Sequence, residues 1–309
     1  MYLNFGDLGQ NAKEYVEQFA SKQAGGAKLN SIEEMKRFVE EYPEFRRLSG
    51  NVTKHVTLVT ELSRRVGTDN LLNVSELEQS LACNDNHTQD VKTLQQLIQK
   101  PSIPPSNKLR LVAIYALRYA GHTSNSTPAL LDLLAVAGGV SRHRIQLIQK
   151  LLTYASSLQS SQQGGAGGIP DLFQPAQNIF SEARSRFNRG LKGVDNVYTQ
   201  HSPRLETTLQ DLIKGRLNMN THPFVEGGGQ TRDKPQDVIV FIVGGATYEE
   251  ARMVAQVNAS SPGVRVVLGG TGVVNSATFL DEVEEAVDAW PEPRADTAAG
   301  RLRREVGRG

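Results

Sequence analysis

The 309-residue chain carries 34 Lys and Arg against 33 Asp and Glu, and a single Cys. The near-zero net charge argues against a surface devoted to nucleic acid or anionic lipid. One Cys excludes an intramolecular disulfide, which favours a reducing cytosol. The N-terminal segment lacks the basic and apolar regions of a signal peptide, and no apolar run approaches the ~18 residues of a membrane span. We therefore expect any membrane contact to go through partners or a peripheral surface.

Residues 1–160 are predicted to be almost continuously helical. A capping box at Ser31 and Glu34 starts one helix, which Tyr42-Pro43 is predicted to interrupt, because proline lacks a backbone donor and restricts the residue before it. A second helix follows, so residues 31–66 form a predicted αα-hairpin, and the apolar stripe of this second helix is Val52, Val56, Val59, Leu62 and Val66. Further helices are predicted over residues 71–83, 88–100, 107–120, 128–137 and 141–159.

The second half of the chain changes in character. A Ser/Gln/Gly-rich linker is predicted over residues 161–175, followed by a helical continuation over 176–235 with helices near 176–189 and 203–217. Residues 236–289 have a βαβα pattern: the run DVIVFIVGG from Asp237, helix 247–258, the run VRVVLGG from Val264, and helix 276–288. The tail, residues 290–309, is predicted to be disordered.

The two β-branched runs are typical of parallel strands buried on both faces, yet two strands make a poor sheet by themselves. No other segment is a convincing strand. We infer that the missing strands lie upstream of Met1, and the alternative is a partner that supplies them. The predicted fold class is thus α+β and multidomain, a mostly helical domain followed by the closing βαβα half of a parallel-sheet α/β domain.

No pattern predicts catalysis, a metal or a cofactor. The six histidines show no close pairing, Cys83 has no CxxC partner, and no GxSxG elbow is present. The glycines after each strand, Gly244-Gly245 and Gly269-Gly270, lie where a phosphate loop would lie but match neither the Walker A nor the GxGxxG pattern. A nucleotide- or phosphate-binding α/β protein therefore stays as an alternative.

An interaction surface is the remaining candidate site. The hairpin tip combines Tyr42, Phe45 and Leu48 with Arg46, and aromatic and Arg side chains are enriched at protein–protein hot spots. An extended hairpin cannot bury both faces, so apolar positions on its second helix are candidates for receiving another helix. The pattern equally allows these valines simply to pack on neighbouring helices, and a generic helical adaptor is a further alternative.

Several segments resemble the SM (Sec/Munc) family of regulators of SNARE-driven membrane fusion. They include YLNFGDLG from Tyr2, MKRFVEEYPEF from Met35, GNVTKHV from Gly50 and NLLNVSELEQ from Asn70. The runs GLKGVDNVYTQHSP from Gly190 and DVIVFIVGGATYEE from Asp237 are similar to the vacuolar protein sorting branch that acts at the trans-Golgi network and endosomes. The resemblance covers about residues 1–288.

The resemblance implies a non-enzymatic SNARE- and syntaxin-binding regulator of vesicle docking, fusion and protein transport on the Golgi–endosome–vacuole route. It implies a cytoplasmic protein, peripheral on those membranes through its SNAREs. The chain would contain the family's helical third domain and the closing half of its second domain. The residues matching the family's SNARE-templating hairpin are, at the tip, Tyr42, Pro43, Phe45 and Arg46, and, on the second helix, Val52, His55, Val56 and Val59. The resemblance implies that the hairpin near its proline tip helps to template SNARE pairing, with the syntaxin against the inner face of the protein and a vesicle SNARE along the second helix of the hairpin.

Overall fold

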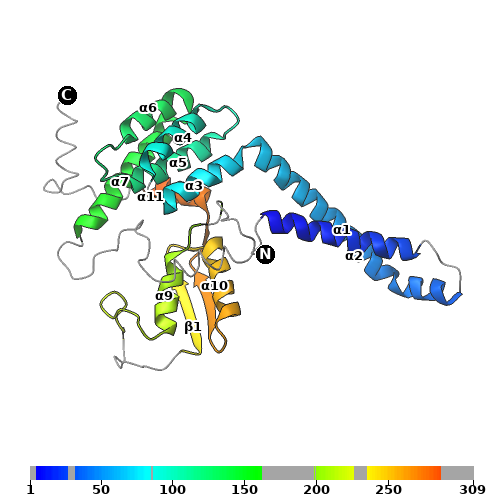
Figure 1. Ribbon diagram of the computed structural model, residues 1–309. Helices are drawn as coiled ribbons and strands as arrows, with labels where there is room; N and C mark the ends of the chain where they lie inside the picture. Colours follow the sequence, from blue (N-terminus) through cyan, green and yellow to red (C-terminus); the bar gives the residue numbers. More distant parts are fainter. Residues whose placement is uncertain are drawn as a thin grey trace. The chain divides into compact units, whose positions relative to one another are not determined.

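The structure is a computed structural model that describes residues 5–26, 32–84, 86–161, 198, 200–225 and 235–286 (Figure 1). The predicted linker, the helix near 176–189, the tail and the capping residue Ser31 lie outside these residues. The chain divides into two compact units, residues 1–72 and 73–309. The first limit falls inside the helical domain predicted over 1–160, while the limits predicted at 160, 175 and 235 stay predictions because they adjoin undescribed segments.

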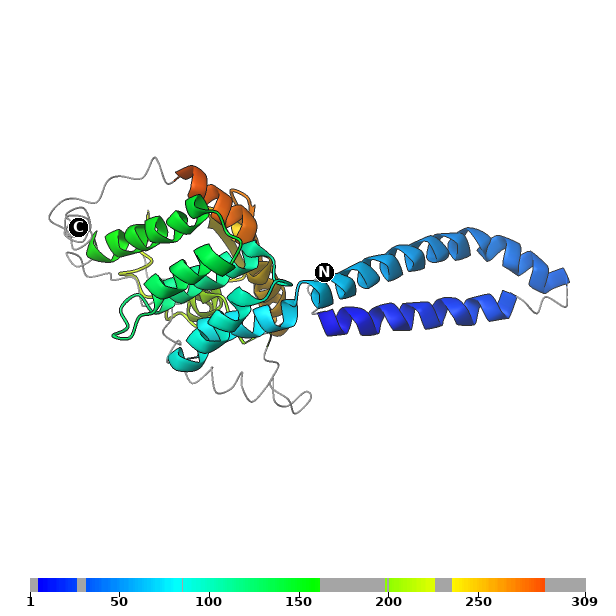
Figure 2. The same cartoon turned by 90° about the horizontal axis from the view of Figure 1, so that it is seen from above.

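The first unit is a pair of long helices, α1 (Phe5–Gly26) and α2 (Ile32–Thr68). The predicted interruption at Tyr42-Pro43 is wrong, because α2 is one helix of 37 residues. The hairpin therefore pairs α2 with α1, which runs alongside it in Figure 2, and not the two halves of residues 31–66. A proline removes one backbone hydrogen bond and kinks a helix, but the remaining bonds of so long a helix hold it together. Figure 2 shows α2 curving along its length.

Five helices form a bundle in the second unit, each within about two residues of its predicted range. They are α3 (Leu71–Cys83), α4 (His87–Gln99), α5 (Pro105–Arg118), α6 (Thr127–Ala137) and α7 (Arg142–Ser161). Prolines stand in the first turns of α5 and α6, where a missing N–H costs nothing. The bundle encloses an apolar core of leucine, isoleucine, valine, alanine and tyrosine side chains contributed by all five helices.

Two buried polar side chains of the bundle, Asp90 and Tyr115, have hydrogen-bond partners. The Asp90 carboxylate accepts hydrogen bonds from the Ser80 hydroxyl at 2.7 Å and from the Tyr119 hydroxyl at 3.0 Å. The Tyr115 hydroxyl lies 2.9 Å from His87 Nε2 and accepts from the backbone of Ser126 at 3.0 Å. These bonds join α3, α4, α5 and the loop before α6, and they satisfy groups whose burial alone would be destabilising.

The last part of the chain contains α9 (Arg204–Ile213), β1 (Asp237–Ile242), β2 (Ala246–Thr247), α10 (Tyr248–Ser260), β3 (Arg265–Gly270), β4 (Val273–Val274) and α11 (Ser276–Ala286). The predicted β–α–β–α order is confirmed. Strand β1 pairs in parallel with β3, from Asp237 opposite Arg265 to Ile242 opposite Gly270. Strand β2 pairs in parallel with β4.

Only one face of the β1–β3 sheet is covered in the described part of the chain. Val238 and Val266 pack with side chains of α9 and α10 in a second, smaller core. On the other face Ile239 is 81% exposed and Phe241 64% exposed. The expectation of strands buried on both faces is therefore wrong for the described residues, because α9 and α10 lie on the same side of the sheet and α11 packs with the bundle instead.

Candidate functional site

All eight residues that were predicted to bind SNAREs lie on α2 of the α1–α2 hairpin. On α1, half-buried positions recur with helical spacing at Leu8, Ala12, Tyr15 and Phe19. The Tyr15 ring meets the His55 ring of α2 edge-on at a centroid distance of 5.7 Å. This contact places the His55 turn of α2 against the middle of α1.

The four residues predicted on the second part of α2 do not share one exposure. Val52 is buried, with 9% of its surface exposed, and Val59 is half-buried. His55 is exposed although its ring touches Tyr15, and Val56 is 41% exposed. Val52 and Val59, seven residues apart, therefore mark the line along which α2 is packed, and Val56 lies beside that line. The structure thus leaves Val56 the accessible valine of the predicted set.

The four residues predicted at the hairpin tip, Tyr42, Pro43, Phe45 and Arg46, all belong to helix α2. Their side chains lie outside the described residues. The structure therefore changes their backbone setting from a turn between two helices to the body of one helix.

Two leucines on α2 add to the exposed apolar surface. Leu58 is 60% exposed and Leu62, one turn later, is 42% exposed. Since successive residues turn by about 100° around a helix, these leucines lie on one side of the Val52–Val59 line and Val56 on the other. The predicted stripe included Leu62 and missed Leu58. The signal that could have found Leu58 is the pair of leucines at i and i+4, which covers adjacent turns of one face.

A charged cluster adjoins the leucines. The Glu61 carboxylate accepts two hydrogen bonds of 2.7 Å from the Arg64 guanidinium and one of 2.9 Å from Arg65 Nε. These bonds lower the pKa of Glu61 to about 2. Leu58 and Leu62 are therefore bordered by a fixed group of charges, as at a binding surface whose rim is polar.

The glycine turns of the sheet were the alternative candidate site, for phosphate. Gly244 and Gly245 have φ values of +105° and +102°, which favour glycine. The amide of Gly244 donates to Thr271 Oγ1 at 3.0 Å. Thr247 and Glu250 form a capping box that occupies amides at the start of α10, and Glu249 adds a negative charge to the same turn. These groups stand where a phosphate would need free donors, so the geometry disfavours a phosphate site at α10.

The residues that the structure describes also bear on membrane spans and metal sites. No helix there is long and apolar enough to cross a bilayer. No group of three or more His, Cys, Asp or Glu side chains there is arranged to hold a metal ion.

The chain matches the model of the Sec1 family over residues 1–282. It belongs to the Sec1 family. Similar Sec1-family members are vacuolar protein sorting-associated protein 45 of Mus musculus, 46% identical over 284 residues, and that of Schizosaccharomyces pombe, 48% identical over 284 residues. These alignments cover 92% and 91% of this chain, and 48% and 49% of the relatives.

The fold is also similar to that of a solved Sec1-family structure, the SM protein Vps45 in complex with the Qa SNARE Tlg2 (1-310). The TM-score is 0.79 at 60% sequence identity, over 94% of this chain and 48% of that chain. This chain therefore spans about half the length of the relatives it matches, and its mostly helical architecture with a small parallel sheet is a Sec1-family fold.

Proposed function

We propose that this chain acts in a SNARE-binding regulator of vesicle docking and fusion on the Golgi–endosome–vacuole route. The observation that carries the proposal is its likeness to Vps45, whose solved structure holds the Qa SNARE Tlg2. The role is binding without catalysis: the partners are a syntaxin-type SNARE and a vesicle SNARE helix. The protein would be cytoplasmic and would reach Golgi, endosomal or vacuolar membranes through these SNAREs.

The hairpin is the proposed site for the vesicle SNARE helix. An amphipathic helix binds by laying apolar residues at i, i+3, i+4 and i+7 into an apolar groove. Helix α2 offers such residues at the surface on both sides of its packed line, Val56 on one side and Leu58 and Leu62 on the other. The charges of Glu61, Arg64 and Arg65 beside the leucines would fix the register of the bound helix.

The segment of α2 that was predicted as the hairpin tip, residues 42–46, is the proposed site of a switch in SNARE assembly, and Pro43 is its centre. In the continuous helix α2, residue 43 has no N–H to donate to the Val39 carbonyl, so the helix is weakest there. A straight, extended tip would lengthen the surface available to a second helix, with Tyr42, Phe45 and Arg46 as contacts. Holding two disordered SNARE segments side by side would lower the ordering entropy of bundle nucleation.

The part of the chain from β1 to α11 is proposed to be the closing βαβα half of a parallel-sheet α/β domain. The support is the exposed face with Ile239 and Phe241, which further elements of such a domain would cover.

The site is tested by placing a charge on each side of the packed line of α2. Val56→Asp and Leu58→Asp would each be measured for binding of labelled vesicle SNARE peptides, with circular dichroism to check folding. We expect at least a tenfold loss of affinity, about 1.4 kcal/mol or more, for the variant on the side that receives the peptide, because a buried unpaired carboxylate is costly.

The matched control is Thr57→Asp, since Thr57 is exposed and about 150° around α2 from the packed line. It introduces the same charge and should bind as the wild type. If both Val56→Asp and Leu58→Asp keep full affinity while folded, the hairpin is not the site.

The tip is tested by Pro43→Ala, which restores the donor to the Val39 carbonyl. We expect faster SNARE assembly, because the restored hydrogen bond stabilises the continuous form of α2 against bending at residue 43. A folded variant with unchanged or slower assembly would contradict the switch. A panel of SNARE peptides from several routes separates the proposal from a generic helical adaptor, which would bind them all alike.

A further inference from the structure

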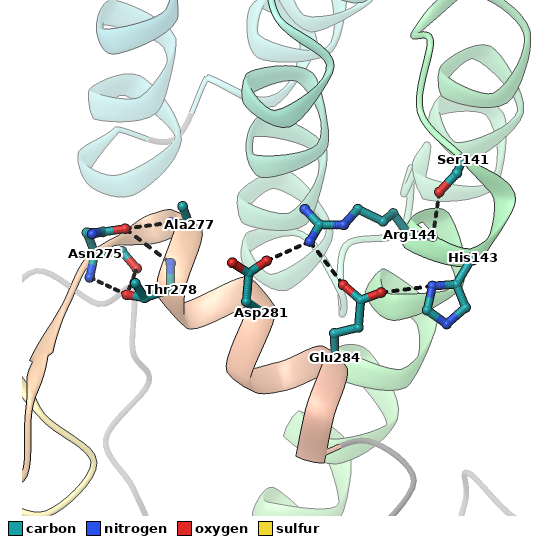
Figure 3. Close-up of polar contacts among 8 residues, drawn as sticks. All are labelled: Ser141, His143, Arg144, Asn275, Ala277, Thr278, Asp281 and Glu284. Atoms are coloured by element: carbon teal, nitrogen blue, oxygen red, sulfur yellow. Dashed lines mark hydrogen bonds and ion pairs between the residues drawn. The ribbon is translucent and has the colours of Figure 1, made fainter.

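Helix α11 begins abruptly at the end of β4. The Asn275 side-chain oxygen accepts hydrogen bonds from the backbone amides of Ala277 at 2.9 Å and Thr278 at 3.1 Å (Figure 3). The Thr278 hydroxyl in turn accepts from the Asn275 amide at 2.9 Å. These bonds cap the helix and fix its direction relative to the strand that precedes it.

The buried face of α11 belongs to the helical bundle. Leu280 is 8% exposed and lies in the same apolar core as Ile145 and Ile148 of α7. In an ordinary βαβα unit this second helix would cover the sheet. Here the sheet face carrying Ile239 and Phe241 stays exposed, while α11, which directly follows β4, packs against α7 of the bundle.

Charges on the next turns of α11 reinforce this contact. Arg144 Nη2, from the first turn of α7, donates to Asp281 Oδ1 at 2.6 Å and to Glu284 Oε2 at 3.0 Å (Figure 3). His143 Nδ1 lies 3.0 Å from the other oxygen of Glu284. The bond to Asp281 raises the pKa of Arg144 above its ordinary value. At the other end of α11, Arg110 of α5 donates to the Ser276 hydroxyl at 3.1 Å.

We call α9, α10 and strands β1–β4 the sheet segment. We propose that α11 is a clasp held by ion pairs, which fastens the sheet segment to the helical bundle and can detach while both stay folded. Helix α11 buries two apolar side chains, Leu280 and Val283, and only Leu280 belongs to the core of the bundle among many side chains of α3–α7, so its loss would leave the bundle largely intact. The Arg144 ion pairs are partly exposed to solvent, and such pairs are individually weak and weakened by salt. A helix held in this way opens by local unfolding more easily than the elements that it joins.

The two pieces also meet at a second place. Gln79 of α3 accepts hydrogen bonds on its side-chain oxygen from the backbone amides of Gln200 and His201, at 2.8 and 2.7 Å. Release of α11 would therefore let the sheet segment turn about this second contact.

The experiment is amide hydrogen exchange of the full chain, comparing Arg144→Glu with the wild type. The new carboxylate would face Asp281 and Glu284, so we expect exchange in residues 276–286 to rise about tenfold or more. Exchange in α4, α5, β1 and β3 should stay within about twofold. The matched control is Arg142→Glu, an exposed arginine two residues away, which should leave α11 unchanged.

A second experiment swaps the charges on the two sides of the contact. Arg144→Glu combined with Asp281→Arg and Glu284→Arg should restore slow exchange in α11. Raising salt from 0.05 to 0.5 M should speed α11 exchange in the wild type but not in Arg144→Gln. Three results would each overturn the clasp. They are unchanged hydrogen exchange of α11 in Arg144→Glu, no return to slow hydrogen exchange in the variant with swapped charges, and an equal acceleration of hydrogen exchange in α4 and α5. The clasp is independent of SNARE binding, so its failure leaves the proposed function untouched.

Discussion

The helical bundle and the α1–α2 hairpin bury apolar side chains to very different extents. In the bundle, five helices enclose residues such as Leu94, Ile98 and Leu111, none of which has measurable exposure. In the described part of the hairpin, Val52 alone among the apolar residues is classed as buried, and Leu58 and Leu62 face solvent. A two-helix hairpin has no third layer, so each helix keeps an apolar side available to another molecule.

The β1–β3 sheet stands between these two cases. One face packs in a small core with α9 and α10, and the other exposes Ile239 and Phe241. The comparison indicates where stability resides and where contacts with other elements form: the bundle supports itself, whereas the hairpin and the open sheet face offer apolar surface.

The largest test of this contrast is one truncation made in both regions. Leu94→Ala, in the bundle core, should lower the free energy of unfolding by about 3 kcal/mol, because a fully buried leucine leaves a cavity. Leu58→Ala, on the hairpin, should change it by less than about 0.5 kcal/mol. Urea unfolding followed by far-ultraviolet circular dichroism measures both, since the hairpin and the bundle are both helical. Equal losses would mean that the hairpin surface is not free.

A second test concerns the polar bonds inside the bundle. Asp90→Ala removes an acceptor from both the half-buried Ser80 hydroxyl and the buried Tyr119 hydroxyl and should cost about 2 kcal/mol, because each loses its bond to this carboxylate. Ser80→Ala removes one donor only and should cost about 1 kcal/mol. The same unfolding measurement applies. A loss for Asp90→Ala no larger than that for Ser80→Ala would mean that the Tyr119 bond contributes nothing.

A third test compares the two faces of the sheet through adjacent valines of β3. Val266 is buried against α10, whereas Val267 is on the exposed face. Val266→Ala should destabilise the sheet segment by about 1.5 kcal/mol, and Val267→Ala by less than about 0.5 kcal/mol. Hydrogen exchange of β1 and β3 measures both. A comparable loss for Val267→Ala would show that its face is covered in solution.

The sequence allowed the bundle helices and both main strands to be predicted, because each has an apolar period or a β-branched run that depends on local residues alone. Pro43 misled because a local rule for ending helices was applied where a long helix accommodates the proline. The position of α11 could not be predicted, since Leu280 fits a sheet or a bundle equally well. The ionic partner of α11, Arg144, lies 137 residues before Asp281 in the sequence, so no local pattern links them. Leu58 was missed because a stripe shows which residues share a face but not which face is packed.

The smallest expected effect concerns the charges at the end of α2. The pKa of Glu61, about 2 in the folded chain, lies below its ordinary value of 4.5. Its bonds to Arg64 and Arg65 therefore stabilise the helix fully above about pH 4.5, and this contribution is lost as the pH falls through about 2. Hydrogen exchange in residues 54–68, corrected for intrinsic rates, should thus accelerate on acidification in the wild type and less in Glu61→Gln.

The control for Glu61→Gln is Glu17→Gln on α1, whose carboxylate lies 3.9 Å from Lys13 and makes a much weaker contact. It should keep the wild-type acid response in residues 54–68, since the Glu61 bonds remain. At pH 7, Glu61→Gln itself should open this end of α2 slightly more often than the wild type, because an uncharged amide holds two guanidinium groups less strongly. If both variants respond to acid as the wild type does, the exposed charges do not stabilise α2. Its helicity then depends on packing along the Val52–Val59 line.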